Sequence, residues 1–152
     1  MSIEQTPRGV LHPKNVDYLM ALLDSQSIGV DKGLPRKVWP VRLRKLYIQS
    51  LNDNYPIGSI VLRKESSESN RMIIIDSGQR IGTIKLFLSG QIPYISCSSK
   101  KAIYFKQVPG APSREVADRE WKTRFLNQRL DIFIYNEMSD DEARRVYQLM
   151  NC

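Results

Sequence analysis

Residues 72–80 read MIIIDSGQR, an apolar run followed by an acid, a glycine, an amide and a guanidinium. The apolar run predicts a mostly buried strand, and the apolar residues that recur at helical spacing after Arg80 predict a helix. A helix N-terminus offers unpaired N–H groups and the positive end of the helix dipole to a phosphate. Two interpretations follow. This junction is an anion-binding site, or Asp76 and Ser77 only cap a helix and Gly78 eases a turn.

The length and composition indicate one folded domain. A chain of 152 residues can bury a sizeable core, and 41% hydrophobic with 26% charged residues is ordinary for a globular protein. No segment approaches the roughly 18 apolar residues of a membrane span, and residues 1–10 lack the apolar core of a secretory signal. The sequence therefore predicts a cytoplasmic or nuclear protein with no membrane partner.

The cysteine and histidine content limits the chemistry that the chain can perform. There are two cysteines, Cys97 and Cys152, and one histidine, His12. This set predicts neither a disulfide framework nor a zinc site nor a Ser-His-Asp triad. Any catalysis would rest on carboxylates, amides, hydroxyls, arginines or a bound divalent ion.

An excess of positive charge favours an acidic partner. The net charge of +7 and the isoelectric point near 9.5 place nucleic acid first among such partners. The alternative is that scattered lysines and arginines serve only solubility. The basic residues gather at 36–37, 42–45, 100–101, 119–129 and 144–145.

Hydrophobic periodicity predicts a mixed α/β domain, with a small mixed sheet flanked by helices. Helices are expected at 15–24, 40–55, 80–88, 114–128 and 140–150, and strands at 57–63, 71–75, 102–108 and 130–135. The second helix should bury one apolar stripe, formed by Leu43, Leu46, Tyr47 and Leu51. A capping box at 139–142 should begin the last helix.

Several short sequence motifs occur in an order that is typical of one family. They are Val38 with Trp39, YPIGSI at 55–60, IDSGQRIGTI at 75–84, FLSGQIP at 87–93, and SDDE at 139–142 with a helix running to Asn151. In this order they resemble the DGQQR-containing N-terminal domain of GmrSD-type restriction endonucleases, in the ParB/sulfiredoxin-like superfamily, and most of all its fungal DGKQR-type branch. The resemblance implies a ParB/sulfiredoxin-like, DGQQR-type domain at 28–152, preceded by an N-terminal helical extension at 1–27.

The resemblance also implies a function. In the family the DGQQR loop binds and hydrolyses a nucleoside triphosphate and couples this to DNA restriction, so the expected partners are a nucleoside triphosphate, DNA or both. The implied catalytic residues are Asp76, Gln79 and Arg80. Asp76 would hold a Mg²⁺ cofactor or orient a water, Arg80 would neutralise charge on phosphate oxygens, and Gln79 would orient water or ribose. The implied phosphate-binding set is Ser77, Gly78, Gln79, Arg80 and Thr83, and the implied nucleic-acid contacts are Arg36, Lys37 and Trp39.

Departures from the family pattern leave two functional interpretations open. The family's DGQQR is DSGQR at 76–80, Gly82 stands where a threonine is expected, and the Gln-Arg pair before the tryptophan has no clear counterpart. The chain is either a Mg²⁺-dependent nucleotide hydrolase or nuclease-family enzyme, or a non-catalytic DNA/RNA-binding or interaction module. Two structural alternatives also stand, with Arg80 in a buried ion pair with Asp76 and Trp39 as a lid on the core.

Overall fold

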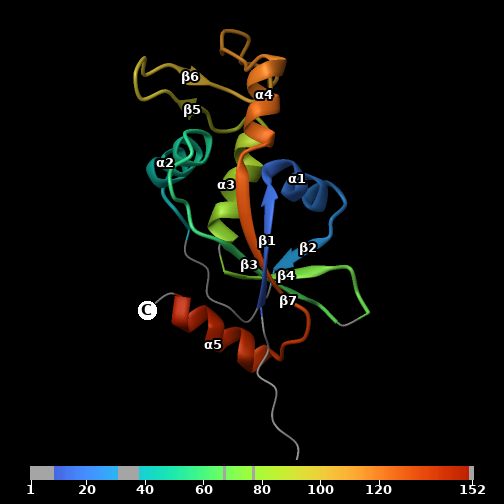
Figure 1. Cartoon of the computed structure of the whole chain (residues 1–152). Helices are drawn as coiled ribbons and strands as arrows, with labels where there is room; N and C mark the ends of the chain where they lie inside the picture. The colour runs from blue at the N-terminus through green and yellow to red at the C-terminus, as the bar shows by residue number, and fades with distance from the viewer. Residues whose placement is uncertain (1–8, 31–37, 67, 77, 151–152) are drawn as a thin grey trace, which may run out of the picture.

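The computed structural model describes residues 9–30, 38–66, 68–76 and 78–150, which form a mixed α/β fold (Figure 1). The main sheet has five strands in the order β1-β7-β3-β4-β2. They are β1 (Gly9–Asn15), β2 (Ile28–Val30), β3 (Ile60–Lys64), β4 (Met72–Asp76) and β7 (Arg129–Tyr135). The pairs β1–β7 and β3–β4 are antiparallel, whereas β3–β7 and β2–β4 are parallel. The predicted α/β class and mixed sheet are therefore confirmed.

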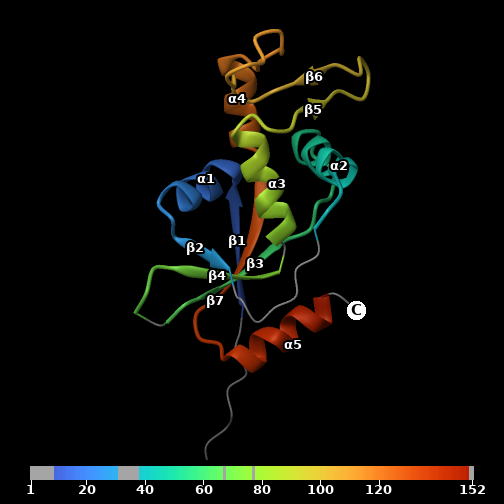
Figure 2. The same ribbon diagram turned by 180° about the vertical axis from the view of Figure 1, so that it is seen from behind.

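Helices and a small hairpin surround this sheet. The helices are α1 (Val16–Asp24), α2 (Val41–Asn52), α3 (Gly78–Leu88), α4 (Arg119–Leu126) and α5 (Asp140–Met150). The hairpin pairs β5 (Tyr94–Ile95) with β6 (Ala102–Ile103). Figures 1 and 2 show that α4 and the hairpin lie at the end of the molecule opposite α5, with α3 running between that end and the sheet. Among the described residues, no helix has the length and apolar character needed to cross a bilayer.

The two faces of the sheet bury two separate clusters of side chains. In β7, Leu130, Ile132 and Ile134 join the main core, to which α1, α2, α3 and α4 all contribute. The alternate residues Phe133 and Tyr135 pack instead with Ala143 of α5. Successive side chains of a strand point to opposite faces, so one strand can supply both clusters.

The capping signals in the sequence are confirmed. The Asn15 side chain accepts a hydrogen bond from the Tyr18 N–H at 2.9 Å and so begins α1. The Ser139 hydroxyl accepts from the Glu142 N–H at 3.2 Å, and the Glu142 carboxylate accepts from the Ser139 N–H at 3.0 Å. The hydrogen bond from the Ser139 backbone N–H to the carboxylate is the largest cause of the lowered pKa of Glu142. Local hydrogen bonding thus fixes the start of both helices.

Three strands were missed, and the first or last residues of other elements were predicted wrongly. β1, β2 and β5 were not expected, and the strand expected at 102–108 is only β6 followed by a single bridge between Tyr104 and Val116. The helix expected at 114–128 begins at Arg119, because the Asp118 carboxylate accepts from the Trp121 N–H at 2.8 Å and caps it there. The limit of α4 was wrong because a local polar contact overrides apolar spacing, whereas β1, β2 and β5 depend on pairing with other strands.

The N-terminal extension expected at 1–27 contains a strand as well as a helix. β1 pairs with β7 from Gly9 to Asn15, and Val16 and Leu19 of α1 are fully buried in the main core. The described part of this extension therefore shares its sheet and its core with the rest of the fold.

The buried face of α2 is rotated from the predicted stripe. Tyr47, Ile48 and Leu51 are buried, as expected for two of them, but Leu43 and Leu46 are 37% and 45% exposed. The apolar residues of α2 therefore form a wider band than the core covers, and periodicity alone could not select the covered part.

Gly82→Ala should stabilise the fold. Gly82 lies inside α3, and a methyl group added there meets no atom within 4 Å. Because glycine in a helix costs about 0.5–1 kcal/mol relative to alanine, we expect the free energy of unfolding in urea to rise by that amount. Gly90→Ala is the contrasting variant and should be destabilised, since Gly90 has a φ of +82° and its added carbon would lie 2.5 Å from the Lys106 carbonyl oxygen. Destabilisation by both substitutions would contradict this description of α3.

Candidate functional site

The junction between β4 and α3 is the centre of the candidate site. β4 ends at Asp76 and α3 begins at Gly78. The N–H groups in the first turn of a helix have no acceptor within that helix, so they can serve a ligand that lies before it. A Cβ added at Gly78 would lie 3.8 Å from Ile74, an ordinary contact, so the space around this residue does not require glycine.

Gln79 and Thr83 hold the start of α3 in place. The Gln79 side-chain oxygen accepts a hydrogen bond from the Trp39 backbone N–H at 2.9 Å. The Thr83 hydroxyl is fully buried and donates to the Gln79 carbonyl oxygen at 2.6 Å. In this conformation Thr83 offers no surface to a ligand, so its visible role is to position the turn that carries Gln79.

Arg80 reaches from α3 to the turn that precedes β3. Its Nη1 donates to the Ser59 carbonyl oxygen at 2.8 Å. Gly58, with a φ of +73°, lies directly against the guanidinium, since a Cβ added there would be 3.1 Å from Arg80 Nη2. This turn belongs to the YPIGSI motif at 55–60. The fold therefore brings the YPIGSI motif at 55–60 into contact with the motif at 76–80, and it fixes Arg80 beside the first turn of α3.

Tyr47 is a candidate site residue that the sequence analysis assigned only to the core. Its side chain is 7% exposed, and its hydroxyl has no hydrogen-bond partner within the described residues. Burial raises the pKa of Tyr47, and the positive charge of Arg80 opposes that rise. The Tyr47 ring packs on Trp39, whose backbone N–H donates to Gln79, and this connects Tyr47 to the first turn of α3. An unsatisfied buried polar group costs roughly 1–3 kcal/mol, so such a hydroxyl calls for a ligand or a water. A tyrosine on an apolar stripe gives no sequence signal that separates this role from packing.

Trp39 covers the same region from the segment before α2. Its ring packs edge-on against the Tyr47 ring, with the centroids 5.7 Å apart and the planes at 63°. The ring is half-buried and packs against the main core, as a lid would. Its predicted contact with nucleic acid stays a prediction.

Comparison with known proteins identifies the family. A sequence model of the GmrSD restriction endonuclease N-terminal domain matches residues 36–151, which is more than half of the chain. The chain belongs to this family. The family predicted from the sequence motifs is thus confirmed, whereas its fungal DGKQR-type branch stays a prediction. No curated protein matches the sequence significantly.

One solved structure that resembles this GmrSD-type domain is the C-terminally truncated chromosome-partitioning protein ParB from Caulobacter crescentus, complexed with CTP-γ-S. The TM-score is 0.49 and the sequence identity 10%, over 94% of this chain and 53% of the ParB chain. The chain therefore spans about half the length of that protein. A likeness this weak transfers no ligand and no function.

The remaining predicted site residues of this GmrSD-type domain lie outside the described residues. They are Arg36, Lys37, Ser77 and the side chain of Asp76, whose backbone pairs with Val61 at the end of β4. Within the described part of the chain, no group of three or more His, Cys, Asp or Glu could hold a metal ion. The nearby oxygens of Gln79 and Thr83 are engaged by the protein. The side chain of Asp76, the predicted Mg²⁺ ligand, lies outside the described residues, so the Mg²⁺ cofactor stays a prediction.

Proposed function

We propose that this GmrSD-type domain binds the phosphates of a nucleoside triphosphate at the first turn of α3. The observation that carries the proposal is the Arg80 guanidinium, which lies beside that turn against the Ser59 carbonyl oxygen and Gly58. The buried Tyr47 hydroxyl is connected to the same turn through Trp39, whose ring packs on Tyr47 and whose N–H donates to Gln79. A guanidinium binds phosphate oxygens through a planar fork of donors, and helix N–H groups add further donors for an anion. The hydroxyl would gain the partner that it lacks among the described residues.

Binding without turnover is the form of this function that we favour. Hydrolysis of a phosphoanhydride needs an oriented water as well as neutralised charge. Gln79, the residue implied to orient water, already has its side-chain oxygen engaged by the Trp39 N–H, so at most one of its two lone pairs is left for a water. The loop at 76–80 also has only one of the two glutamines of the family pattern, because Gly78 stands in place of the first. Asp76 would then have to orient the water with little help from a neighbouring amide oxygen.

We propose Mg²⁺ only as a companion of the bound nucleotide. This ion usually keeps several waters and binds through one or two carboxylates together with substrate phosphates. Asp76 is the carboxylate of the loop and would supply the protein's ligand, while the ion would neutralise phosphate charge. Removing Mg²⁺ should therefore weaken triphosphate binding without abolishing it.

DNA or RNA is the second candidate ligand of this region. Trp39 is half-exposed beside Tyr47, and an aromatic ring in that position can stack on a base. Arg36 and Lys37 precede it in the sequence and would contact phosphates. Polymer binding of this kind should weaken steeply with salt, because phosphate contacts release counterions.

Isothermal titration calorimetry tests the proposed nucleotide site. The purified protein is titrated with ATP, GTP, CTP and UTP, with Mg²⁺ and again with EDTA, and phosphate release is followed in parallel. We expect binding of at least one nucleotide and no phosphate release above background. Phosphate release that disappears in Asp76→Ala would establish the hydrolase instead. No binding of any of the four nucleotides would end the proposal.

Tyr47→Phe should separate binding from stability. The substitution removes a buried hydroxyl that has no partner among the described residues, so the free energy of unfolding should rise by about 1 kcal/mol. If a bound phosphate satisfies that hydroxyl, nucleotide affinity should fall about tenfold in the same variant. Calorimetry and urea denaturation measure the two effects. A more stable variant with unchanged affinity would exclude Tyr47 from the site.

Gly58→Ala should impair nucleotide binding through Arg80. Gly110→Ala is its matched control, because Gly110 has a φ of +83° with nothing near its added carbon, whereas the carbon added at Gly58 crowds the guanidinium. Both substitutions carry the cost of a left-handed residue, about 1–2 kcal/mol, so both should lose similar stability. Only Gly58→Ala should lose affinity in calorimetry. Equal affinities in the two variants would mean that the position of Arg80 does not matter for binding.

A further inference from the structure

A second surface of the molecule carries most of its net charge. Residues 96–129 contain eight Lys or Arg against three Asp or Glu, which is a net of +5 out of the chain's +7. They comprise the turn after β5, β6, the segment up to α4, α4 itself and the first residue of β7; the hairpin and α4 lie at the end opposite α5 (Figures 1 and 2). We define the basic patch as Lys100, Lys101, Lys106, Arg119, Lys122 and Arg124.

The charges of the basic patch are not neutralised by ion pairs. Within the described residues, none of its six cations forms a salt bridge, although arginines elsewhere do, including Arg63 with Asp140 and Arg71 with Glu65. One local acid, Asp118, has its carboxylate engaged as the cap of α4. The other two acids, Glu115 and Glu120, are exposed and leave the net charge positive.

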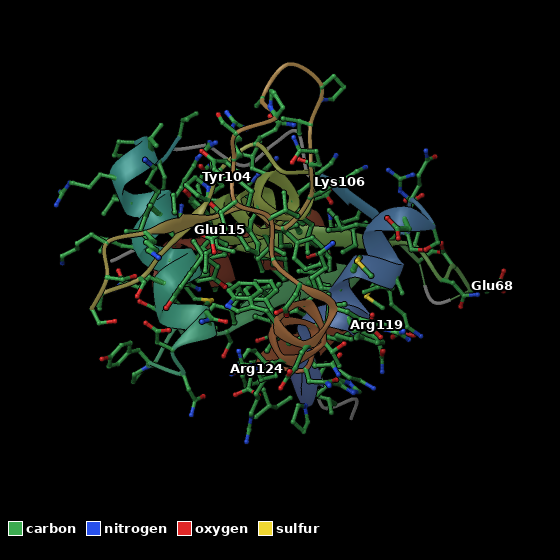
Figure 3. All side chains as sticks on the ribbon, turned by 90° about the horizontal axis from the view of Figure 1, so that it is seen from above. Glu68, Tyr104, Lys106, Glu115, Arg119 and Arg124 are labelled. Carbon is green, nitrogen blue, oxygen red and sulfur yellow. The ribbon has the colours of Figure 1, made fainter. Side chains whose placement is uncertain are left out.

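Two neighbouring elements bring these cations together. The Lys122 Nζ lies 5.4 Å from the centre of the Phe105 ring, which joins α4 to the segment that follows β6. Arg119 lies one helical turn before Lys122, and Lys106 follows Phe105 directly. Figure 3 looks down on this end and shows Arg119 and Arg124 on different sides of α4, with Lys106 on the adjoining segment, so the patch extends around the helix. The patch is thus produced by tertiary packing and not by one run of basic residues.

The patch has the character of a nucleic-acid contact and not of a protein interface. Protein interfaces have an apolar centre, whereas nucleic-acid interfaces are polar and strongly positive. The exposed large apolar side chains of the described chain lie on β1, in and around α2, and at the end of α5, and none lies between residues 96 and 129. A group of cations with no exposed large apolar side chain among them fits a phosphate backbone best.

We propose that the basic patch binds the phosphate backbone of a nucleic acid, at a surface separate from the nucleotide site. The nucleotide site lies at the first turn of α3. The basic patch begins beyond the other end of that helix, where Gly90 abuts the Lys106 backbone. Eleven helical residues span roughly 16 Å, so the two sites are connected by a rigid element without sharing residues. This inference extends the nucleic-acid part of the proposed function and does not require the nucleotide site.

Two triple variants with the same change in net charge test the proposal. The patch variant carries Lys106→Gln, Arg119→Gln and Arg124→Gln, and the control carries Lys85→Gln, Arg144→Gln and Arg145→Gln, all at exposed positions. Binding of labelled duplex DNA and duplex RNA of about 20 base pairs is followed by fluorescence anisotropy over a salt series. For the patch variant we expect the affinity for the duplex to be at least about tenfold lower at low salt. The slope of log K against the logarithm of the salt concentration should become shallower by roughly 2 to 3. The control should stay close to the unmodified chain.

The outcomes distinguish this proposal from the nucleotide site. Nucleotide affinity should be unchanged in both triple variants, and a chain that binds no nucleotide but loses duplex binding in the patch variant refutes only the nucleotide site. Equal weakening in both variants would show that net charge alone attracts the polymer, and this would overturn the patch. So would a lack of duplex binding by the unmodified chain, or competition by polyglutamate as effective as that by DNA, which would point to an acidic protein.

Discussion

Arg80→Ala should weaken nucleotide binding about 10- to 100-fold. A hydrogen bond to a charged group contributes roughly 1.5–3 kcal/mol, and each 1.4 kcal/mol changes an affinity tenfold. The bond from Arg80 Nη1 to the Ser59 carbonyl oxygen holds the guanidinium in position before a ligand arrives. A guanidinium has five N–H donors, more than this one bond uses. Calorimetry with the nucleotide that binds most tightly measures the loss. The affinity of Arg80→Lys should lie between those of the unmodified chain and Arg80→Ala, because lysine keeps the charge without the planar fork.

Arg63→Ala is the matched control for this loss. The Arg63 side chain is only 11% exposed, donates to the Met138 carbonyl oxygen at 3.1 Å and pairs with Asp140 at 2.7 Å beside α5. Its removal should therefore reduce stability at least as much as the removal of Arg80, and nucleotide affinity should stay within about twofold. A comparable loss of affinity in both variants would mean that a weakened fold, and not a lost phosphate contact, explains the result for Arg80.

Much of the fold could be predicted from the sequence because its signals are local. Asn15 and the capping box at 139–142 begin helices through bonds to residues three positions away, and the apolar runs of β4 and β7 are long enough to identify. β2 could not be predicted in this way. Three residues carry no period, and its place depends on pairing with β4.

The candidate site could be predicted only in its loop. The DSGQR motif at 76–80 identified Gln79 and Arg80 as candidate site residues, but it did not identify the groups that position them. Ser59 reaches Arg80 across 21 residues of sequence, and the Trp39 N–H reaches Gln79 across 40. A backbone carbonyl or N–H has no residue-specific signature, and Tyr47 is read as core by any periodic pattern. Contacts of this kind depend on tertiary packing, so sequence spacing could not reveal them.

Phe87→Ala should destabilise the fold by about 3–5 kcal/mol, the usual cost of removing a fully buried aromatic ring. Phe87 has no exposed surface, and its ring centroid lies 4.8 Å from Phe125, 5.6 Å from Phe105 and 6.0 Å from Trp121. The typical total stability of a domain is only about 5–15 kcal/mol, so this single substitution should shift the urea midpoint more than any other discussed above. Tyr55→Ala is the control, since Tyr55 is 59% exposed and should change stability by less than about 0.5 kcal/mol.

The same substitution should loosen one end of the molecule before the other. The Phe87 ring lies near the C-terminal end of α3 and connects it to α4 and to Phe105, the elements that carry the basic patch. The opposite end of α3 is held by the Gln79 and Arg80 contacts, which the substitution does not touch. In Phe87→Ala, amide hydrogen exchange should therefore accelerate most in residues 94–128, and duplex binding should weaken before nucleotide binding does. Uniform acceleration along the whole of α3 would mean that the aromatic cluster and the nucleotide site are one cooperative unit, and that the two proposed sites are not independent.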